Sequence, residues 1–323
     1  LFMDSVPSWA AVNETVSLAR KLRGKGAGGL VNAVLRRVIR EGEAPVPSDT
    51  AGRISVRHSH PEWLIRRWMD MFGEEVTEQI ARAGDEKHPV FIRVNRLRAE
   101  RDELMNVFAD SGCEPVALER SNDYIAVSRA TGLFDSAAFK AGLFTVQDPA
   151  AGIAVELLSP EPGEHILDLC AAPGGKSTRI AEMTGDNATI TAVDIHANRG
   201  GLVQESAERL GLTSIRIVEA DAQSFAPHIQ YDRVLLDAPC TGTGVLSKRP
   251  DMKWRVSEED IGRLSALQYS MLEHAAELVR PGGVLVYSTC TLEHDENGGH
   301  IRRFLASRPE YHVEPDSRFD AFA

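Results

Sequence analysis

The stretch His-Ile-Leu-Asp-Leu-Cys-Ala-Ala-Pro-Gly-Gly-Lys-Ser (165–177) runs from a short apolar segment through a glycine-rich turn into a polar segment. The apolar segment predicts a buried parallel strand, and a helix is expected at 177–183. Small residues in such a turn let the backbone approach a ligand, and the following helix presents free N–H groups to an anion. This unit predicts an α/β fold with a ligand site at the carboxyl end of the strand.

Two phosphate-binding patterns fail at this turn. A P-loop requires glycine at the position of Cys170, and the dinucleotide pattern G-x-G-x-x-G is absent. A compact ligand with a charged amino-acid end therefore fits better than a polyphosphate.

Regular β–α alternation extends from about residue 148 onward. Further strands are predicted at 189–193, 215–218, 233–236 and 284–287, and further helices at 199–210 and 258–279. This alternation is typical of a doubly wound parallel sheet, and we expect its strands in the order 3-2-1-4-5.

Acidic residues lie within or after the first four predicted strands, at Asp168, Asp194, Asp221 and Asp237. Asp194 follows Gly174 by 20 positions, the spacing of a carboxylate that binds a ribose hydroxyl. Asp221 is placed to accept from an adenine amino group. Helix capping is the alternative for both residues, but convergence on one rim favours a nucleoside ligand.

Cys240 and Cys290 follow the fourth and fifth predicted strands. Neighbouring strands lie roughly 5 Å apart, so the two thiols are expected to face one pocket with Asp237 beside them. The alternatives are two small buried hydrophobes or a disulfide. The rim position favours cysteine chemistry, although the spacing does not rank the two thiols.

Composition narrows the class of protein. The four cysteines (Cys113, Cys170, Cys240 and Cys290) form no C-x-x-C pair, so no structural zinc or other metal site is predicted, and free thiols favour a cytoplasmic location. No segment approaches the roughly 18 apolar residues of a membrane helix, and residues 1–5 do not resemble a signal peptide.

The net charge of −11 is unevenly distributed: residues 1–101 carry +4 and the remainder −15. Basic residues cluster at 20–25, 36–40 and 93–101. Such clusters are most often solvated helix faces, and alone they are weak evidence for a polyanion partner.

The first half of the chain predicts smaller units. Helices are expected at 9–22, 30–41, 61–72 and 74–83, with a glycine-rich turn at 24–29 and an extended linker at 42–50. An α+β unit follows at 89–147, with strands near 90–94, 124–127 and 143–146 and a helix across 100–110.

Three motifs, in this order, resemble those of RNA cytosine-C5 methyltransferases: Asp-Leu-Cys-Ala-Ala-Pro-Gly-Gly-Lys (168–176), Asp-Ala-Pro-Cys-Thr-Gly-Thr-Gly (237–244) and Tyr-Ser-Thr-Cys-Thr (287–291). Residues 144–149 look like the start of that catalytic domain, and residues 6–43 are similar to the end of a NusB-like RNA-binding domain. The resemblance is to the RsmB/Sun type of the NOL/NOP/Sun family and covers nearly the whole chain.

The resemblance implies a Rossmann-like class I methyltransferase sheet in 148–323. Before it would come the remnant of an all-helical NusB-like domain (1–43), a linker (44–60) and a small helical plus α+β RNA-binding subdomain (61–147). The chain is then truncated at both ends, with the last antiparallel strand missing. The implied activity is S-adenosylmethionine-dependent methylation of cytosine C5 in small-subunit (16S) ribosomal RNA by a monomer.

The resemblance also assigns roles to residues. Cys290 would attack cytosine C6 and Cys240 would assist release, while Asp237 would lie against the base edge or the cofactor's methionine part. Methionine would be held by Cys170, Ala171, Ala172, Pro173, Gly174, Gly175 and Lys176, the ribose by Asp194 with Arg199 in support, and the adenine by Asp221. Lys248, Arg249, Lys253 and Arg255 would contact RNA phosphates or form a plain exposed loop.

Three alternatives remain open: another RNA such as tRNA, DNA, or no catalysis. DNA cytosine methyltransferases use the cysteine of a Pro-Cys motif, which would make Cys240 the nucleophile. A non-catalytic RNA-binding factor is disfavoured by the retained cysteines and acidic residues.

Overall fold

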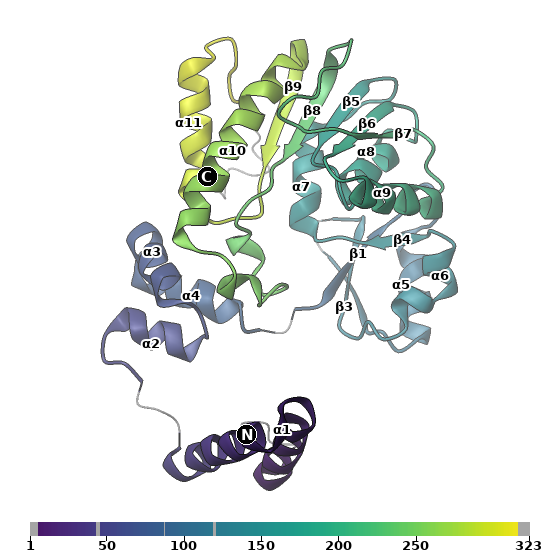
Figure 1. The fold of residues 1–323 in the computed structure, drawn as a ribbon. Coiled ribbons are helices and arrows are strands. Elements are labelled where there is room, and N and C mark those ends of the chain that lie inside the picture. The colour runs from purple at the N-terminus through teal and green to yellow at the C-terminus, as the bar shows by residue number, and fades with distance from the viewer. Residues whose placement is uncertain (1–5, 43–45, 87, 119–120, 316–323) are drawn as a thin grey trace. The chain divides into compact units, whose positions relative to one another are not determined.

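A computed structural model describes residues 6–42, 46–86, 88–118 and 121–315. The chain divides into two compact units, Leu1–Glu78 and Gln79–Ala323, and helix α4 (Glu74–Ala83) spans the boundary between them. Figure 1 labels the helices and strands of both units.

The first unit is helical. Helix α1 (Ser8–Glu41) breaks at Gly24, whose φ of 84° is left-handed. The break turns the chain so sharply that the Arg20 side chain packs over Gly28, where a Cβ would collide with it. The predicted pair of helices is therefore confirmed, but the predicted turn over 24–29 is wrong, because only Gly24 leaves the helix.

The predicted linker at 44–60 is also partly wrong, because helix α2 (Thr50–Arg57) lies inside it. The Asp49 carboxylate caps α2 by accepting from the Gly52 N–H. Helix α2 packs on α3 (Glu62–Phe72) through buried apolar side chains that include Ile54, Leu64 and Trp68. Residues 43–45 lie outside the described residues, and the remaining domain boundaries stay predictions.

The second unit begins with a four-stranded antiparallel sheet in the order β2-β3-β1-β4. Its strands are β1 (Val90–Val94), β2 (Pro115–Ala117), β3 (Tyr124–Val127) and β4 (Phe144–Val146), and its helices are α5 (Arg101–Asp110) and α6 (Ala137–Lys140). Ile92, Phe108 and Phe144 form its core with neighbouring apolar residues. Of these elements, the three-residue strand β2 and the four-residue helix α6 were not predicted.

A five-stranded, all-parallel sheet follows in the order β7-β6-β5-β8-β9. Its strands are β5 (His165–Leu169), β6 (Thr189–Asp194), β7 (Ile215–Glu219), β8 (Tyr231–Asp237) and β9 (Val279–Ser288). The predicted strand order 3-2-1-4-5 is thus confirmed. The expectation about a further antiparallel strand concerns the chain end, where residues 316–323 lie outside the described part.

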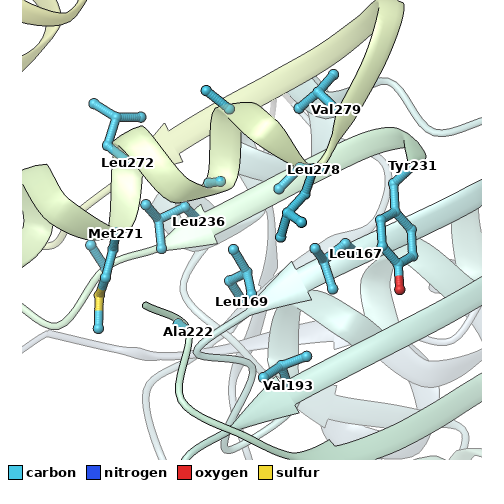
Figure 2. Close-up of a cluster of buried hydrophobic side chains, with 14 of the residues drawn as sticks. Leu167, Leu169, Val193, Ala222, Tyr231, Leu236, Met271, Leu272, Leu278 and Val279 are labelled. Carbon is cyan, nitrogen blue, oxygen red and sulfur yellow. The ribbon is translucent and has the colours of Figure 1, made fainter. Parts of the chain in front are cut away.

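Helices cover both faces of this sheet. One face packs against α7 (Pro149–Leu158), α8 (Gly175–Met183) and α9 (Ala197–Leu210), and the other against α10 (Glu258–Glu277) and α11 (Gly298–Ser307). Figure 2 labels Leu167, Leu169 and Leu236 of the sheet and Met271 and Leu272 of α10, which belong to one buried apolar cluster. Alternate residues such as Ile166 and Leu235 face the other helices. Because both faces are buried, the strands read as apolar runs, which is why their positions could be predicted.

Candidate active site

The two thiols meet at the carboxyl ends of β8 and β9. Asp237 and Ser288 end these neighbouring strands in register, and the Ala238 N–H donates to the Ser288 carbonyl at 2.9 Å. Beyond this point the two chains bring Cys240 Sγ to 3.3 Å from Cys290 Sγ. Both cysteines are free, so the arrangement is a hydrogen-bonded thiol pair.

The pair differs in acidity. The hydrogen bond from Cys240, helped by the positive charges of Lys176 and Arg249, lowers the pKa of Cys290 to about 7, against the opposing effects of burial and Asp237. The same hydrogen bond, together with burial, raises the pKa of Cys240. Cys290 is therefore the more acidic of the two thiols and Cys240 the less acidic. The thiolate is the reactive form of cysteine, so the geometry favours Cys290 as the nucleophile.

A carboxylate and an ammonium group adjoin the thiols. Asp237 Oδ2 lies 2.6 Å from Lys176 Nζ, and Asp237 Oδ1 accepts from the Ser288 hydroxyl at 2.8 Å. Lys176 belongs to the first residues of α8, so this ion pair joins the glycine-rich turn after β5 to the thiol-bearing loops. Lys176, which the resemblance assigns to the methionine part of the cofactor, thus already has Asp237 as its partner.

The glycine-rich turn is shaped by its backbone. Cys170 has a φ of 63° and Gly174 a φ of 100°, both left-handed. A Cβ at Gly174 would lie 3.0 Å from the Cα of Val203 in α9, so only glycine fits there without displacement. Burial raises the pKa of Cys170 to about 12, which keeps it a neutral thiol.

Asp194 and Arg199, predicted to bind the ribose of the cofactor, lie against this turn. The Asp194 carboxylate accepts from the Ala172 N–H at 3.2 Å and from the His196 N–H at 3.1 Å. The Arg199 guanidinium donates to the Ala172 carbonyl at 3.0 Å. A cavity of about 310 Å³ opens beside Asp194, between α9 and β7.

Asp221 lies at the next strand end. Ala220, the residue after β7, donates its N–H to the Asp194 carbonyl at the end of β6, at 3.2 Å. Asp221 is the next residue in the chain. Its Oδ1 accepts from the Gln223 N–H at 2.9 Å, so the carboxylate also shapes a turn.

Asp168 belongs to the predicted acidic rim, where no individual role was assigned to it. It is fully buried, and burial raises its pKa to about 7. Its Oδ2 accepts from the Ser177 hydroxyl at 2.5 Å, while Oδ1 has no hydrogen-bond partner among the described residues. A buried acceptor without a partner is rare and points to a missing donor. The signal in the sequence was its place one residue before the strand end, which the acidic pattern already included.

Two residues of the basic clusters and loops, Arg93 and Lys253, are buried. Arg93 is fully buried in β1, where it pairs with Glu182 of α8 at 2.8 Å and donates to the Gly175 carbonyl at 2.8 Å. Lys253 is only 7% exposed. Arg93 is therefore not part of a solvated basic face, and the prediction that Lys253 contacts RNA or lies in a plain exposed loop is wrong, because both side chains are buried.

The other three basic residues of this loop are exposed. Lys248 pairs with Asp148, and Arg255 pairs with Asp251 at 3.2 Å. Arg249 lies close enough to the thiols to lower the pKa of Cys290. Of the four, Arg249 is therefore the one that the structure connects with the site.

A parallel sheet of this order, with a glycine-rich turn after its first strand and acidic residues at the next strand ends, defines a Rossmann-like α/β domain. Comparison with known proteins narrows the class. Residues 155–321 match the family model for 16S rRNA methyltransferase RsmB/F, residues 60–133 the RsmF/B-like ferredoxin-like domain, and residues 1–40 the NusB family. The chain belongs to the RsmB/F family of rRNA methyltransferases.

Curated proteins similar to this chain are named as rRNA methyltransferases, in agreement with the family models. The chain is 38% identical to the probable ribosomal RNA small subunit methyltransferase B of Bacillus subtilis, over 98% of this chain and 71% of that protein. It is 36% identical to the ribosomal RNA small subunit methyltransferase B of Vibrio cholerae, over 94% and 70%.

Solved structures share the fold. A crystal structure of PH0851 superposes with a TM-score of 0.87 at 32% identity, over 99% of this chain and 73% of that chain. NSun6 from Pyrococcus horikoshii, solved with SFG, superposes with a TM-score of 0.73 at 24% identity, over 80% of this chain and 89% of that chain.

No described helix is both long enough and apolar enough to span a bilayer.

Proposed function

We propose that this protein transfers a methyl group from S-adenosylmethionine to C5 of a cytosine in small-subunit rRNA, through a covalent bond between Cys290 and C6 of the base. The observation that carries the proposal is the thiol pair, 3.3 Å apart, beside the Asp237–Lys176 ion pair. A methyltransferase that acts on an oxygen or an exocyclic nitrogen has no need of two such thiols.

The cofactor fits the turn after β5. SFG, bound by the related NSun6, is an analogue of S-adenosylmethionine. Asp168 Oδ1, which has no partner among the described residues, would accept from the ammonium group of the cofactor, and Asp194 would bind its ribose, as acidic residues do in such sheets. The cofactor supplies a methyl group on a sulfonium centre.

The chain's own residues activate the base. Cys290 Sγ, as a thiolate, bonds to C6. The π pair of C5–C6 shifts into C4–C5 and that of C4–N3 moves onto N3, which takes a proton from water and returns it when C5 bonds to the methyl group and the sulfonium sulfur leaves as a neutral thioether. We infer that Asp237 stabilises the protonated N3 edge. The base must leave its stack to reach the thiols. This covalent step makes C5 nucleophilic, which divides one difficult substitution into easier steps.

Cys240 acts in release. After methylation, C5 loses its proton to water, the S–C6 bond breaks, and its electron pair returns to Cys290 as the double bond re-forms. The raised pKa of Cys240 favours its protonated form, so its S–H can donate to the departing thiolate across the 3.3 Å that separates the two sulfurs.

Two variants test the assignment. Cys290→Ala should lose methyl transfer to rRNA by at least about 10³-fold, because the nucleophile is absent. Cys240→Ala should accumulate a protein–RNA adduct that survives denaturing electrophoresis. Labelled methyl incorporation into rRNA, tRNA and DNA, followed by bisulfite sequencing, identifies the substrate and the modified atom. Retained activity in Cys290→Ala would show that the mechanism is wrong.

A further inference from the structure

A buried carboxylate lies behind the thiol pair. Glu296 is fully buried, in a short 3-10 turn (His294–Glu296) that follows the Cys290 loop. The mechanism proposed above does not use this residue. Burial of a carboxylate is costly unless it is fully hydrogen-bonded, so its partners indicate what it does.

The Glu296 carboxylate accepts four hydrogen bonds. Oε2 accepts from the Thr241 N–H at 2.9 Å and from the Gln268 amide at 2.7 Å. Oε1 accepts from the Thr241 hydroxyl at 2.5 Å and from the Thr291 hydroxyl at 3.3 Å. Thr241 directly follows Cys240 and Thr291 directly follows Cys290, so one carboxylate binds both thiol-bearing loops.

The side chains of Gln268 and Asn297 add further hydrogen bonds to the two thiol-bearing loops. The Gln268 amide also donates to the Pro239 carbonyl, on the other side of Cys240, at 2.8 Å. Asn297 accepts from the Thr289 hydroxyl at 2.5 Å and donates to the Thr291 carbonyl at 2.9 Å, so it brackets Cys290.

We propose that Glu296 is a positioning residue that holds the Cys240 and Cys290 loops in register and so sets the separation of the two thiols. It contacts neither sulfur and acts through Thr241 and Thr291. The catalytic consequence rests on the proposed function: without Glu296, Cys240 would drift from the S–C6 bond whose cleavage it assists. Attachment by Cys290 would continue while release would slow.

Disulfide formation measures the register directly and does not depend on the RNA chemistry. Diamide accepts two protons and two electrons as Cys240 and Cys290 join, and mass spectrometry of the linked peptides reports the rate. An intramolecular rate follows the effective concentration of the two groups. We expect Glu296→Ala to form this disulfide roughly tenfold more slowly or worse than the natural protein.

Two further variants separate register from general stability. Glu296→Gln is the conservative rescue: its oxygen can keep the Thr241 N–H and Gln268 amide, while the two threonine hydroxyls rotate to accept from its amide, so a near-natural rate is expected. Glu182→Ala removes another buried carboxylate, which pairs with Arg93 at 2.8 Å and contacts neither thiol-bearing loop. This variant should leave the disulfide rate unchanged. If Glu296→Ala does not fold, Thr291→Val removes one bond to the carboxylate and should slow the reaction in the same direction.

The proposal is overturned if folded Glu296→Ala matches the natural rate, or if Glu182→Ala slows the reaction equally. With rRNA, Glu296→Ala should also accumulate the denaturation-resistant adduct. If the natural protein and Cys240→Ala form no adduct at all, the covalent function fails, while the disulfide rates still decide the role of Glu296.

Discussion

Cys240 and Cys290 are the same kind of side chain in different electrostatic settings. Cys290 receives the hydrogen bond and the effect of two positive charges, whereas Cys240 donates the hydrogen bond and is penalised by burial. The sequence placed both thiols at one rim but could not rank them, because the ranking depends first on the hydrogen bond between the two sulfurs and then on the proximity of Lys176 and Arg249 to Cys290. That proximity is a property of folded loops.

The acidity of Cys290 can be measured by alkylation with iodoacetamide across pH. The natural protein should show a midpoint near the Cys290 pKa of about 7. Cys240→Ala removes a donor that stabilises the thiolate, so the midpoint should rise towards the ordinary 9.0. Asp237→Asn removes a negative charge that opposes the thiolate, so the midpoint should fall. Midpoints that stay unchanged in both variants would contradict this electrostatic account. Cys170, with a pKa of about 12, does not titrate in this range.

At the scale of elements, the glycine-rich turn and α9 are fitted to each other. Gly174 approaches the backbone of Val203, and Arg199 near the start of the same helix holds the Ala172 carbonyl. From the other side, Arg93 of β1 holds the Gly175 carbonyl. The proposed methionine site is thus shaped by three elements, one of which belongs to the preceding antiparallel sheet.

Substitution of Gly174 tests this fit. Gly174→Ala combines a φ of 100° with a Cβ 3.0 Å from a backbone atom, and should lower the free energy of unfolding by about 2–4 kcal/mol. S-adenosylmethionine affinity, measured by calorimetry, should fall as the turn shifts.

The matched control is Gly185→Ala, at a φ of 64° with nothing within 4 Å of the added Cβ. It should cost only about 1–2 kcal/mol in urea unfolding and leave cofactor affinity intact. Equal costs at the two positions would argue against the close approach to α9.

At the scale of the whole molecule, an acidic catalytic region and a basic first third coexist in one chain. The net charges of +4 for residues 1–101 and −15 for the rest suggest that the first part supplies most of the attraction to rRNA. The NusB match over residues 1–40 covers two of the basic clusters.

Salt dependence measures that attraction. Arg23→Gln with Lys25→Gln should lower the slope of log Kd for rRNA against log salt concentration by roughly one to two units, since each lost phosphate contact removes about 0.7–0.9. A matched pair, Arg129→Gln with Arg263→Gln, removes exposed charges from the acidic region and should leave the slope nearly unchanged. Equal slopes for the two pairs would show that RNA contact is not concentrated in the first third.

The sequence by itself determined the parallel sheet, its strand order and the meeting of two thiols with Asp237 at one rim. Strands buried on both faces leave continuous apolar runs, and the carboxyl ends of parallel strands must share one edge. Only the tertiary structure decided the helix inside the expected linker, the burial of Arg93 and Lys253, the unpartnered oxygen of Asp168 and the Glu296 junction behind the thiols. These features depend on contacts between distant segments, because a charged residue reads the same in sequence whether it faces water or a buried partner.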